Sequence, residues 1–365
     1  MSRSCANRTL RLPAWLAVAA LVIVGWALVR ATPAAALRAH DVPRLTLARL
    51  DPCFYAPSPA AWWPVGPRQT PHEIRAGFND PHGEDPMYFH WGVDVSTSTN
   101  DARVYAMTSG RLTGVRLTGP NAKFAIGPFF YYHVVASVVP AGSYVTRGQL
   151  VGHILHDARH VHVAEWEPVC GLVDPRRPTG PFHDPMNTEH PVVRDLTADV
   201  ANRAAYRPFP CWHTPDPSTP LSLRHLHGRV DLRAEIYDMP VRKTTFWPQQ
   251  PLMPSGAYAW LAPPKRRFRR FSRLITVFDG AHWHNGDFYA VMAHGTVRNR
   301  SCFKDPRRPC ENRFIFHVAR SGLDTRNFPD GSYRYCVSAI TINGRRTTTC
   351  WAVRIENHPR RKPTG

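Results

Sequence analysis

Short segments in which apolar and polar residues alternate fill the chain from residue 71 to residue 195, and glycines and prolines separate them. Examples are IRAGF, WGVDVS and HVHV, where every second side chain is apolar. A period of two is typical of β-strands that bury one face, and hardly any stretch shows the 3.6-residue period of an amphipathic helix. The pattern therefore predicts an all-β domain over residues 71–195.

A second series of short strands is predicted between residues 226 and 357. In GRVDLRAEIYD apolar positions alternate with charged ones, and near the end of the chain two alternating segments flank Asn343-Gly344, a strong signal for a hairpin turn. Regularly spaced strands of this kind favour a β-sandwich. The region resembles the Ig-like or fibronectin-like sandwiches appended to many secreted bacterial enzymes, and its expected role is binding or spacing.

Irregular segments flank the two predicted domains. Residues 37–70 are rich in proline and tryptophan and predict a linker that packs on the domain after it. Residues 196–225, which run through YRPFPCWHTPDPSTP, predict a proline-rich linker between the domains. The basic tail over residues 358–365 is predicted to be disordered.

The first 36 residues carry the pattern of an export signal. Three arginines precede an apolar run from Leu12 to Val29, and Ala34-Ala35-Ala36 follows it. A basic flank, an apolar run and a small-residue cleavage site are typical of a signal peptide, so cleavage is expected near Ala36. The run is also near the lower length limit for spanning a bilayer, and a signal anchor is the alternative. Both interpretations place the rest of the chain outside the cytoplasm, secreted or in the cell envelope.

Eight cysteines fit an oxidising compartment. Cys5 would leave with the signal, so seven remain, and one is expected to stay free or to pair between chains. Cys302 and Cys310 bracket a short loop, and Cys336 and Cys350 flank the predicted hairpin. The others are Cys53, Cys170 and Cys211. A two-residue turn would place Cys336 and Cys350 on opposite faces, so a disulfide there requires a three-residue loop or a bulge, and we expect a bulge.

The chain is strongly basic. It holds 46 lysines and arginines against 27 aspartates and glutamates, a formal net charge of +19. Such a charge favours anionic partners: nucleic acid, acidic lipid or an acidic cell-wall polymer. KRRFRRFSR at 265–273 is consistent either with binding of an anionic glycan or with a solvated basic strand or loop. No signature of a nucleic-acid-binding fold appears, so no specific nucleic-acid partner is expected. The composition excludes a collagen, a coiled coil and a polytopic membrane protein. A membrane contact is expected only under the alternative in which the N-terminal segment is an uncleaved anchor.

Histidines and one aspartate in the first domain have the spacing of metal ligands. His90 and Asp94 are four residues apart in a predicted strand, and His160 and His162 are two apart in another, so each pair shares a strand face. Three protein ligands plus a water are the usual layout of a catalytic zinc site, and the remaining histidine would act as an acid or base. His133 lies between these strands. The H-x-H pairs at 225/227 and 282/284 lie in edge or loop contexts that suit a metal less well.

Five segments of the first domain resemble the lysostaphin/LytM-type zinc metallopeptidases, which cut peptide cross-links of bacterial peptidoglycan. They are FHWGVDVS, VYAMTSGRLTGV, YYHVV, AGSYVTRGQLVGHI and HVHVAEW, in the family's order and spacing over roughly residues 70–190. The resemblance implies a duplicated-hybrid-motif β fold and one zinc ion, Zn2+, bound by His90, Asp94 and His162. It makes His133 and His160 the catalytic histidines, with their individual roles left open.

Two segments depart from the family. HILHDARHVH and GPNAKFAIGPFFYYH stand where the family has glycine-rich stretches that border its cleft. A catalytically inactive LytM-like module that binds the cell wall or regulates another enzyme is therefore the alternative to a hydrolase. Because all five candidate site residues precede residue 163, we expect the second domain to be dispensable for hydrolysis of a small soluble peptide.

Overall fold

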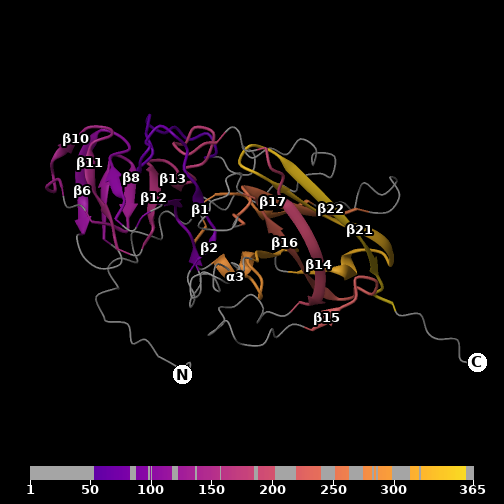
Figure 1. The fold of residues 1–365 in the computed structure, drawn as a ribbon. Helices are drawn as coiled ribbons and strands as arrows, with labels where there is room; N and C mark the ends of the chain where they lie inside the picture. The colour runs from indigo at the N-terminus through magenta and orange to yellow at the C-terminus, as the bar shows by residue number, and fades with distance from the viewer. Residues whose placement is uncertain are drawn as a thin grey trace, which may run out of the picture.

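The computed structural model describes residues 53–82, 88–97, 99, 101–116, 122–135, 138–156, 158–184, 188–201, 219–239, 251–262, 274–281, 283–284, 287–297, 313–319 and 322–358. Among them the regular elements are β-strands, apart from the one-turn helix α3 (Phe288–Val291) and the 3-10 helix η6 (Thr325–Asn327). The all-β prediction is therefore confirmed. Figure 1 shows the strands of the N-terminal half gathered on one side and those of the C-terminal half on the other.

The N-terminal region contains an eight-stranded antiparallel sheet with a three-stranded sheet and a two-stranded ribbon. The large sheet has the order β1 (Ile74–Ala76), β4 (Val93–Ser96), β12 (His160–Glu167), β8 (Phe129–Tyr132), β7 (Lys123–Ile126), β6 (Gly110–Arg116) and β10 (Tyr144–Val145), with β13 (Gly171–Val173) paired to β12. The small sheet has the order β5 (Arg103–Tyr105), β11 (Leu150–Ile154) and β9 (Val134–Val135), and the ribbon joins β2 (Pro81–His82) to β3 (Tyr88–Phe89).

Alternation along β4 and β12 separates the core from the polar face. Val93 and Val95 of β4 and Val161 and Val163 of β12 are fully buried in the first hydrophobic core. The residues between them in sequence point to the opposite face of the sheet. Burial of these valines therefore fixes the direction in which Asp94, His160 and His162 project.

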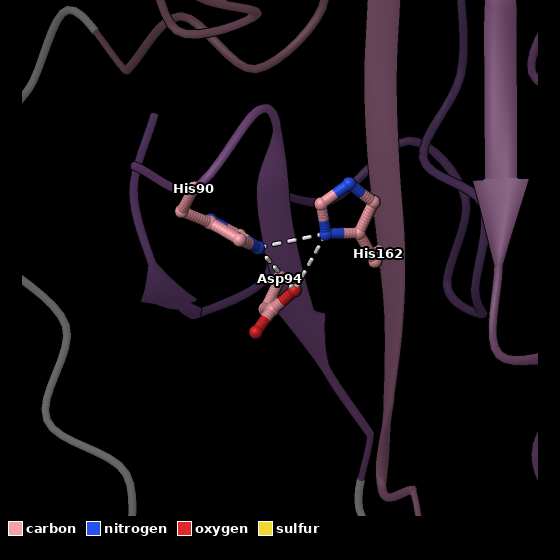
Figure 2. Close-up of side chains that lie close together, drawn as sticks. All are labelled: His90, Asp94 and His162. Carbon is pink, nitrogen blue, oxygen red and sulfur yellow. Dashed lines mark hydrogen bonds and ion pairs between the residues drawn. The ribbon is translucent and has the colours of Figure 1, made fainter. Parts of the chain in front are cut away.

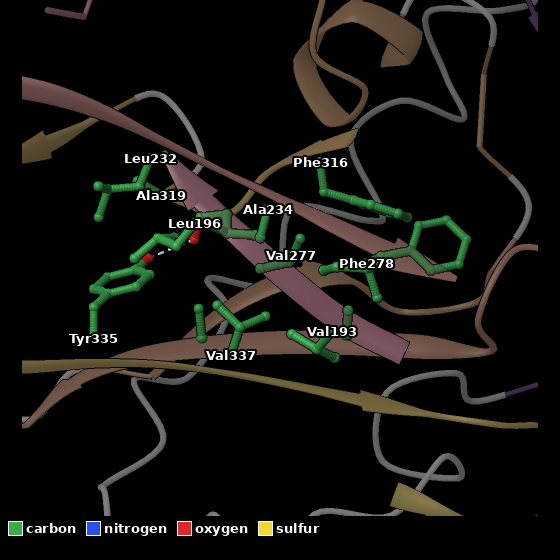
Figure 3. Close-up of a cluster of buried hydrophobic side chains, with 14 of the residues drawn as sticks. Val193, Leu196, Leu232, Ala234, Val277, Phe278, Phe316, Ala319, Tyr335 and Val337 are labelled. Atoms are coloured by element: carbon green, nitrogen blue, oxygen red, sulfur yellow. Dashed lines mark hydrogen bonds between the residues drawn. The ribbon is translucent and has the colours of Figure 1, made fainter. Parts of the chain in front are cut away.

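The C-terminal region consists of two sheets that share one core. One sheet has the order β15 (Pro220–Leu221), β14 (Val192–Val200), β16 (Arg229–Tyr237) and β19 (Ile315–His317), with β20 (Leu323–Asp324) also paired to β16. The other has the order β18 (Leu274–Phe278), β17 (Gly256–Ala262), β21 (Gly331–Ile340) and β22 (Arg346–Ile355). Leu232 of β16 and Val337 of β21 belong to the same buried cluster, which Figure 3 shows. Two sheets with a shared core form a sandwich.

The expected linker over residues 196–225 differs from the structure at both ends. β14 extends to Val200 and pairs with β16, and Leu196 and Ala198 are buried in the C-terminal core. β15 occupies Pro220–Leu221. VVRDLTADV alternates like the other strands, but the prolines after it set the composition of the whole segment. Of the predicted linker at 37–70 the structure describes residues 53–70, and Trp63 and Val65 of this part lie in the first core.

Two disulfides are present among the described residues. Cys53 is bonded to Cys170, and Cys336 to Cys350. Cys336 and Cys350 are direct partners in the register of β21 and β22, as a disulfide across the hairpin requires. The amide of Thr341 donates to the carbonyl of Arg345, so three residues close the turn, with Gly344 at φ 77°. The expected bulge is therefore wrong: a three-residue loop, the alternative, brings the two cysteines into register without any shift between β21 and β22. The other cysteines lie outside the described residues.

Asp238, just after β16, is a buried acid whose charge costs stability. Its backbone exchanges two hydrogen bonds with Leu252, and its side chain is enclosed. Burial raises the pKa of the Asp238 carboxyl to about 7, although Arg176 opposes the shift. The folded protein therefore retains a proton that the unfolded chain releases above its ordinary pKa of 3.8. Stability that is full below pH 3.8 is lost as the pH rises to about 7.

We expect Asp238→Asn to stabilise the protein, and more at pH 8 than at pH 5. Asparagine carries no ionisable group and keeps the Oδ1 atom that accepts a hydrogen bond from the Met239 amide. The gain in the free energy of unfolding should be roughly 2–4 kcal/mol at pH 8. Urea denaturation of both proteins at the two pH values measures it. A gain that does not grow with pH would contradict this assignment.

Candidate metal site

The register of two antiparallel strands brings Asp94 and His162 together. β12 pairs with β4 so that His162 is the direct partner of Asp94, and His160 is the partner of Ser96. Directly opposed residues in an antiparallel pair hold their side chains side by side. The His162 Nδ1 atom lies 3.2 Å from Asp94 Oδ1.

The side chain of His90 also lies beside Asp94 and His162, although His90 is not part of a strand. We expected His90 and Asp94 in one strand, but β4 begins at Val93 and β3 ends at Phe89, so His90 lies in the connection between them. Its Nε2 atom is 3.1 Å from Asp94 Oδ1 and 2.7 Å from His162 Nδ1. Figure 2 shows the three side chains converging. Their ligand atoms all lie within 4.8 Å of one another.

A hydrogen bond to a backbone carbonyl fixes the orientation of the His90 ring. Its Nδ1 atom donates to the carbonyl of Gly77 at 2.9 Å, in a buried position. With the proton on Nδ1, the Nε2 atom carries a lone pair that points at His162 and Asp94. The His162 Nδ1 atom lies 2.7 Å from His90 Nε2. A cation bound between these two nitrogens would compete with a proton for the same position.

Gly92 makes room for the His162 ring. A Cβ atom at position 92 would lie 2.7 Å from His162 Nε2 and 2.4 Å from the carbonyl oxygen of Val163. Both distances are too short for any side chain. The glycine between His90 and Asp94 therefore allows β4 and the imidazole of β12 to approach closely.

The pKa shifts of Asp94 and His162 match a cation site. Burial opposes a charge on Asp94, but His160, His90 and His162 outweigh it and hold the pKa of Asp94 well below its usual range. Burial, together with the neighbouring His90, lowers the pKa of His162 to about 4. At neutral pH the site thus offers a carboxylate and uncharged imidazole, which are typical zinc ligands.

Two further histidines stand beside this cluster. His160 Nδ1 donates to the carbonyl of Ala158, so its Nε2 atom faces the site at 3.6 Å from Asp94 Oδ1. Burial lowers the pKa of His160 to about 3, so the ring is neutral at neutral pH. His133 follows β8 at a positive φ of 62°, and its ring centre is 4.8 Å from that of His160. All five residues selected from the sequence therefore lie together.

The sequence pattern did not point to Arg75 and Tyr132. Arg75 lies on β1, the neighbour of β4, and its Nε atom is 3.9 Å from Asp94 Oδ2. The ring of Tyr132 packs edge-on against His162 at 5.1 Å. Both occupy alternating positions of strands that were predicted, but only strand pairing shows that those positions face the cluster.

The other histidine pairs form no comparable group within the described ranges. His225 Nδ1 lies 2.7 Å from Glu356 Oε2 at an exposed position. Of the pair at 282/284, residue 282 lies outside the described residues. The basic segment at 265–273, the predicted signal and the basic tail beyond residue 358 also lie outside them. None of the described helices is long and apolar enough to cross a membrane.

No protein family model and no curated protein matches the sequence. Among solved structures, the catalytic domain of lysostaphin from Staphylococcus simulans is 21% identical over 28% of this chain and 89% of that chain, with a TM-score of 0.24. A zinc-containing peptidase from Vibrio cholerae is 21% identical over 34% of this chain and 40% of that chain, with a TM-score of 0.25. The SpoIIQ–SpoIIIAH pore-forming complex is 14% identical over 30% of this chain and 84% of that chain, with a TM-score of 0.27. Similarities at this level assign neither a family nor a function.

Proposed function

We propose that the protein is a zinc metalloendopeptidase that hydrolyses peptide cross-links of peptidoglycan in the cell envelope. The convergence of His90 Nε2, Asp94 Oδ1 and His162 Nδ1 carries the proposal, with two further imidazoles beside them. Two nitrogens, one carboxylate oxygen and an open fourth position are the ligand set of catalytic zinc sites. The donor atoms and their burial fit one zinc ion, as do the pKa shifts of Asp94 and His162.

We assign different chemical roles to the two remaining histidines, His160 and His133. A zinc ion on His90, Asp94 and His162 would supply Lewis acidity to a water molecule and to the peptide carbonyl. His160 has its Nδ1 proton committed to the Ala158 carbonyl, so its Nε2 atom is placed to accept a proton from the attacking water and to pass it to the leaving amine as the C–N bond breaks. His133 then donates a hydrogen bond to the carbonyl oxygen as negative charge develops there.

The proposed substrate follows from charge and from the segment resemblance. A net charge of +19 favours an acidic polymer over a neutral one, and a predicted export signal places the chain where peptidoglycan is found. FHWGVDVS and HVHVAEW, which hold the proposed ligands, resemble segments of peptidoglycan endopeptidases.

Digestion of purified cell walls tests the proposal. We expect a protein lacking residues 1–36 to bind about one zinc ion per chain and to release peptides with newly formed amino and carboxyl termini, detected by mass spectrometry. A chelator should abolish the release, and added zinc should restore it. Bound zinc without any hydrolysis would instead favour the non-catalytic cell-wall or regulatory module. A protein that binds no zinc would contradict the metal site itself.

A further inference from the structure

Residues 77–80 form the turn before His90, ahead of strands β2 and β3. Two polar side chains of this turn contact the C-terminal region. Asn79 Nδ2 donates to the carbonyl of Ala281 at 2.8 Å and to that of Gly280 at 3.4 Å. The amide of Met253 donates to Asp80 Oδ1 at 2.6 Å in a buried position. These hydrogen bonds connect residues more than 170 positions apart in sequence.

The residue directly before His90 is part of the C-terminal core. Phe89 is fully buried in the cluster of the two-sheet region, not in the core of its own region. Its ring lies 5.0 Å from that of Phe288 in α3 and 6.3 Å from that of Trp283. Figure 1 accordingly shows α3 next to the β2 end of the N-terminal region. The backbone of His90 is thus attached directly to an aromatic side chain that the other region encloses.

The same turn orients the His90 imidazole. Asp80 Oδ2 accepts a hydrogen bond from the Gly77 amide at 2.7 Å, and the Gly77 carbonyl accepts the His90 Nδ1 proton. The backbone of His90 is held as well, because its amide donates to Asp80 and its carbonyl accepts from Asn79. One oxygen of Asp80 therefore supports the turn that aims His90, and the other binds the C-terminal region.

The guanidinium of Arg176 packs closely against the turn at Gly77. A Cβ atom at position 77 would lie 2.6 Å from Arg176 Nη1, so a larger residue there would displace the guanidinium. Arg176 is itself paired with Asp174. Burial opposes the charge on its guanidinium, but the carboxylates of Asp174, Asp80 and Asp238 raise its pKa. The turn consequently lies between buried groups of both regions and has little space to shift.

We propose that the C-terminal region is a structural part of the metal site, with Asn79, Asp80 and Phe89 as positioning residues that hold His90 in its ligand geometry. The inference rests on the proposed zinc site and goes beyond it. It replaces the expectation that the second domain is dispensable for hydrolysis of a small peptide, because one of the three ligands is fixed by contacts with that domain. Residues that orient a ligand typically contribute 10- to 100-fold to metal affinity.

Two matched pairs of variants test the inference in the chain lacking residues 1–36. Asn79→Gly removes the hydrogen bonds to Gly280 and Ala281 while tolerating the positive φ of 63° at that position. Its control is Asn343→Gly, which removes another hydrogen bond between the regions, from Asn343 Nδ2 to the carbonyl of Asp184. Phe89→Leu is matched by Phe316→Leu, which reduces the same core at a ring that packs on Phe278.

Zinc affinity, measured by competition with a chromophoric chelator, is the readout. We expect Asn79→Gly and Phe89→Leu to weaken zinc binding by roughly 10- to 100-fold, while each control stays within about twofold of the unsubstituted protein. The visible absorption of the Co²⁺-loaded protein should change in the same two variants, because coordination geometry determines it. Thermal unfolding verifies that each variant is folded. If Phe89→Leu does not fold, the comparison of Asn79→Gly with Asn343→Gly alone tests the positioning role.

The outcomes separate the two proposals. If the unsubstituted protein binds no zinc, the proposed function fails. If it binds zinc and the variants at 79 and 89 bind it as tightly as their controls do, the positioning role is wrong while the zinc site stands. Equal weakening in variants and controls would also overturn the role, because contact between the regions in general, not the turn before His90, would then govern the site.

Discussion

Substitution of His162 by alanine will remove most of the zinc affinity, whereas substitution of His160 will leave the zinc bound and slow hydrolysis by roughly 10²–10⁴-fold. His162 Nδ1 is one of the three converging ligand atoms, so its loss leaves only His90 and Asp94. His160 Nε2 lies 3.6 Å from Asp94 Oδ1 and is placed to accept a proton, not to complete the ligand set. Zinc content per chain and the rate of peptide release measure the two effects separately.

His284→Ala is the control for this comparison. It removes a histidine of the second H-x-H pair in the C-terminal region and should change neither zinc content nor rate. Equal loss of zinc in the His160 and His162 variants would contradict the division of roles. Full activity in both would exclude the metallopeptidase proposal and leave the binding module as the better explanation.

Replacing Arg177 by methionine will destabilise the fold by about 3–5 kcal/mol. The Arg177 side chain is 1% exposed and forms two hydrogen bonds with the carboxylate of Glu165, which lies on β12 three residues after His162. It also donates to the carbonyls of Ala56, Pro57 and Asp174. Removal of the guanidinium leaves a buried carboxylate without its counterion. Urea denaturation measures the loss.

A second substitution distinguishes the charge effect from lost packing. Arg177→Met combined with Glu165→Leu should recover part of the stability, since no unpaired charge is then buried. Arg326→Met, at an exposed arginine paired with Asp324, should change stability little. A loss in Arg177→Met no larger than that in the Arg326 control would show that the buried pair does not stabilise the protein.

Alternation along the sequence predicted the strands of the site but not how they pair. The valines on either side of His162 and Asp94 identify the buried face, because a strand with one buried face repeats every two residues. The pairing of His162 with Asp94 depends on the register between segments 68 positions apart, and local patterns do not encode it. His133, in a left-handed conformation after β8, follows neither period.

The contacts of buried charged and aromatic residues were the features of the fold least predictable from the sequence. Arg177 and Glu165 would be assigned to the surface by residue type, yet both are almost fully buried because they neutralise each other. Phe89 belongs to a segment of the first predicted domain but packs in the core of the C-terminal region. The proline content of 196–225 concealed the end of β14. Glu165 and Arg177 are 12 positions apart, and Phe89 packs on Trp283 and Phe288, so neither partnership follows from the local alternation of residues.

The disulfide between Cys53 and Cys170 joins residues 117 positions apart, and all five residues of the proposed site lie between them. The site is therefore carried on a covalently closed ring. A single proteolytic cut anywhere within that ring converts it to two pieces that remain linked, so the zinc ligands stay on one molecule. Such a cut would go unnoticed on a non-reducing gel and appear only after reduction. For a protein proposed to act in the cell envelope, the ring preserves the connection between His90 and His162 after a cut that would separate them in an open chain.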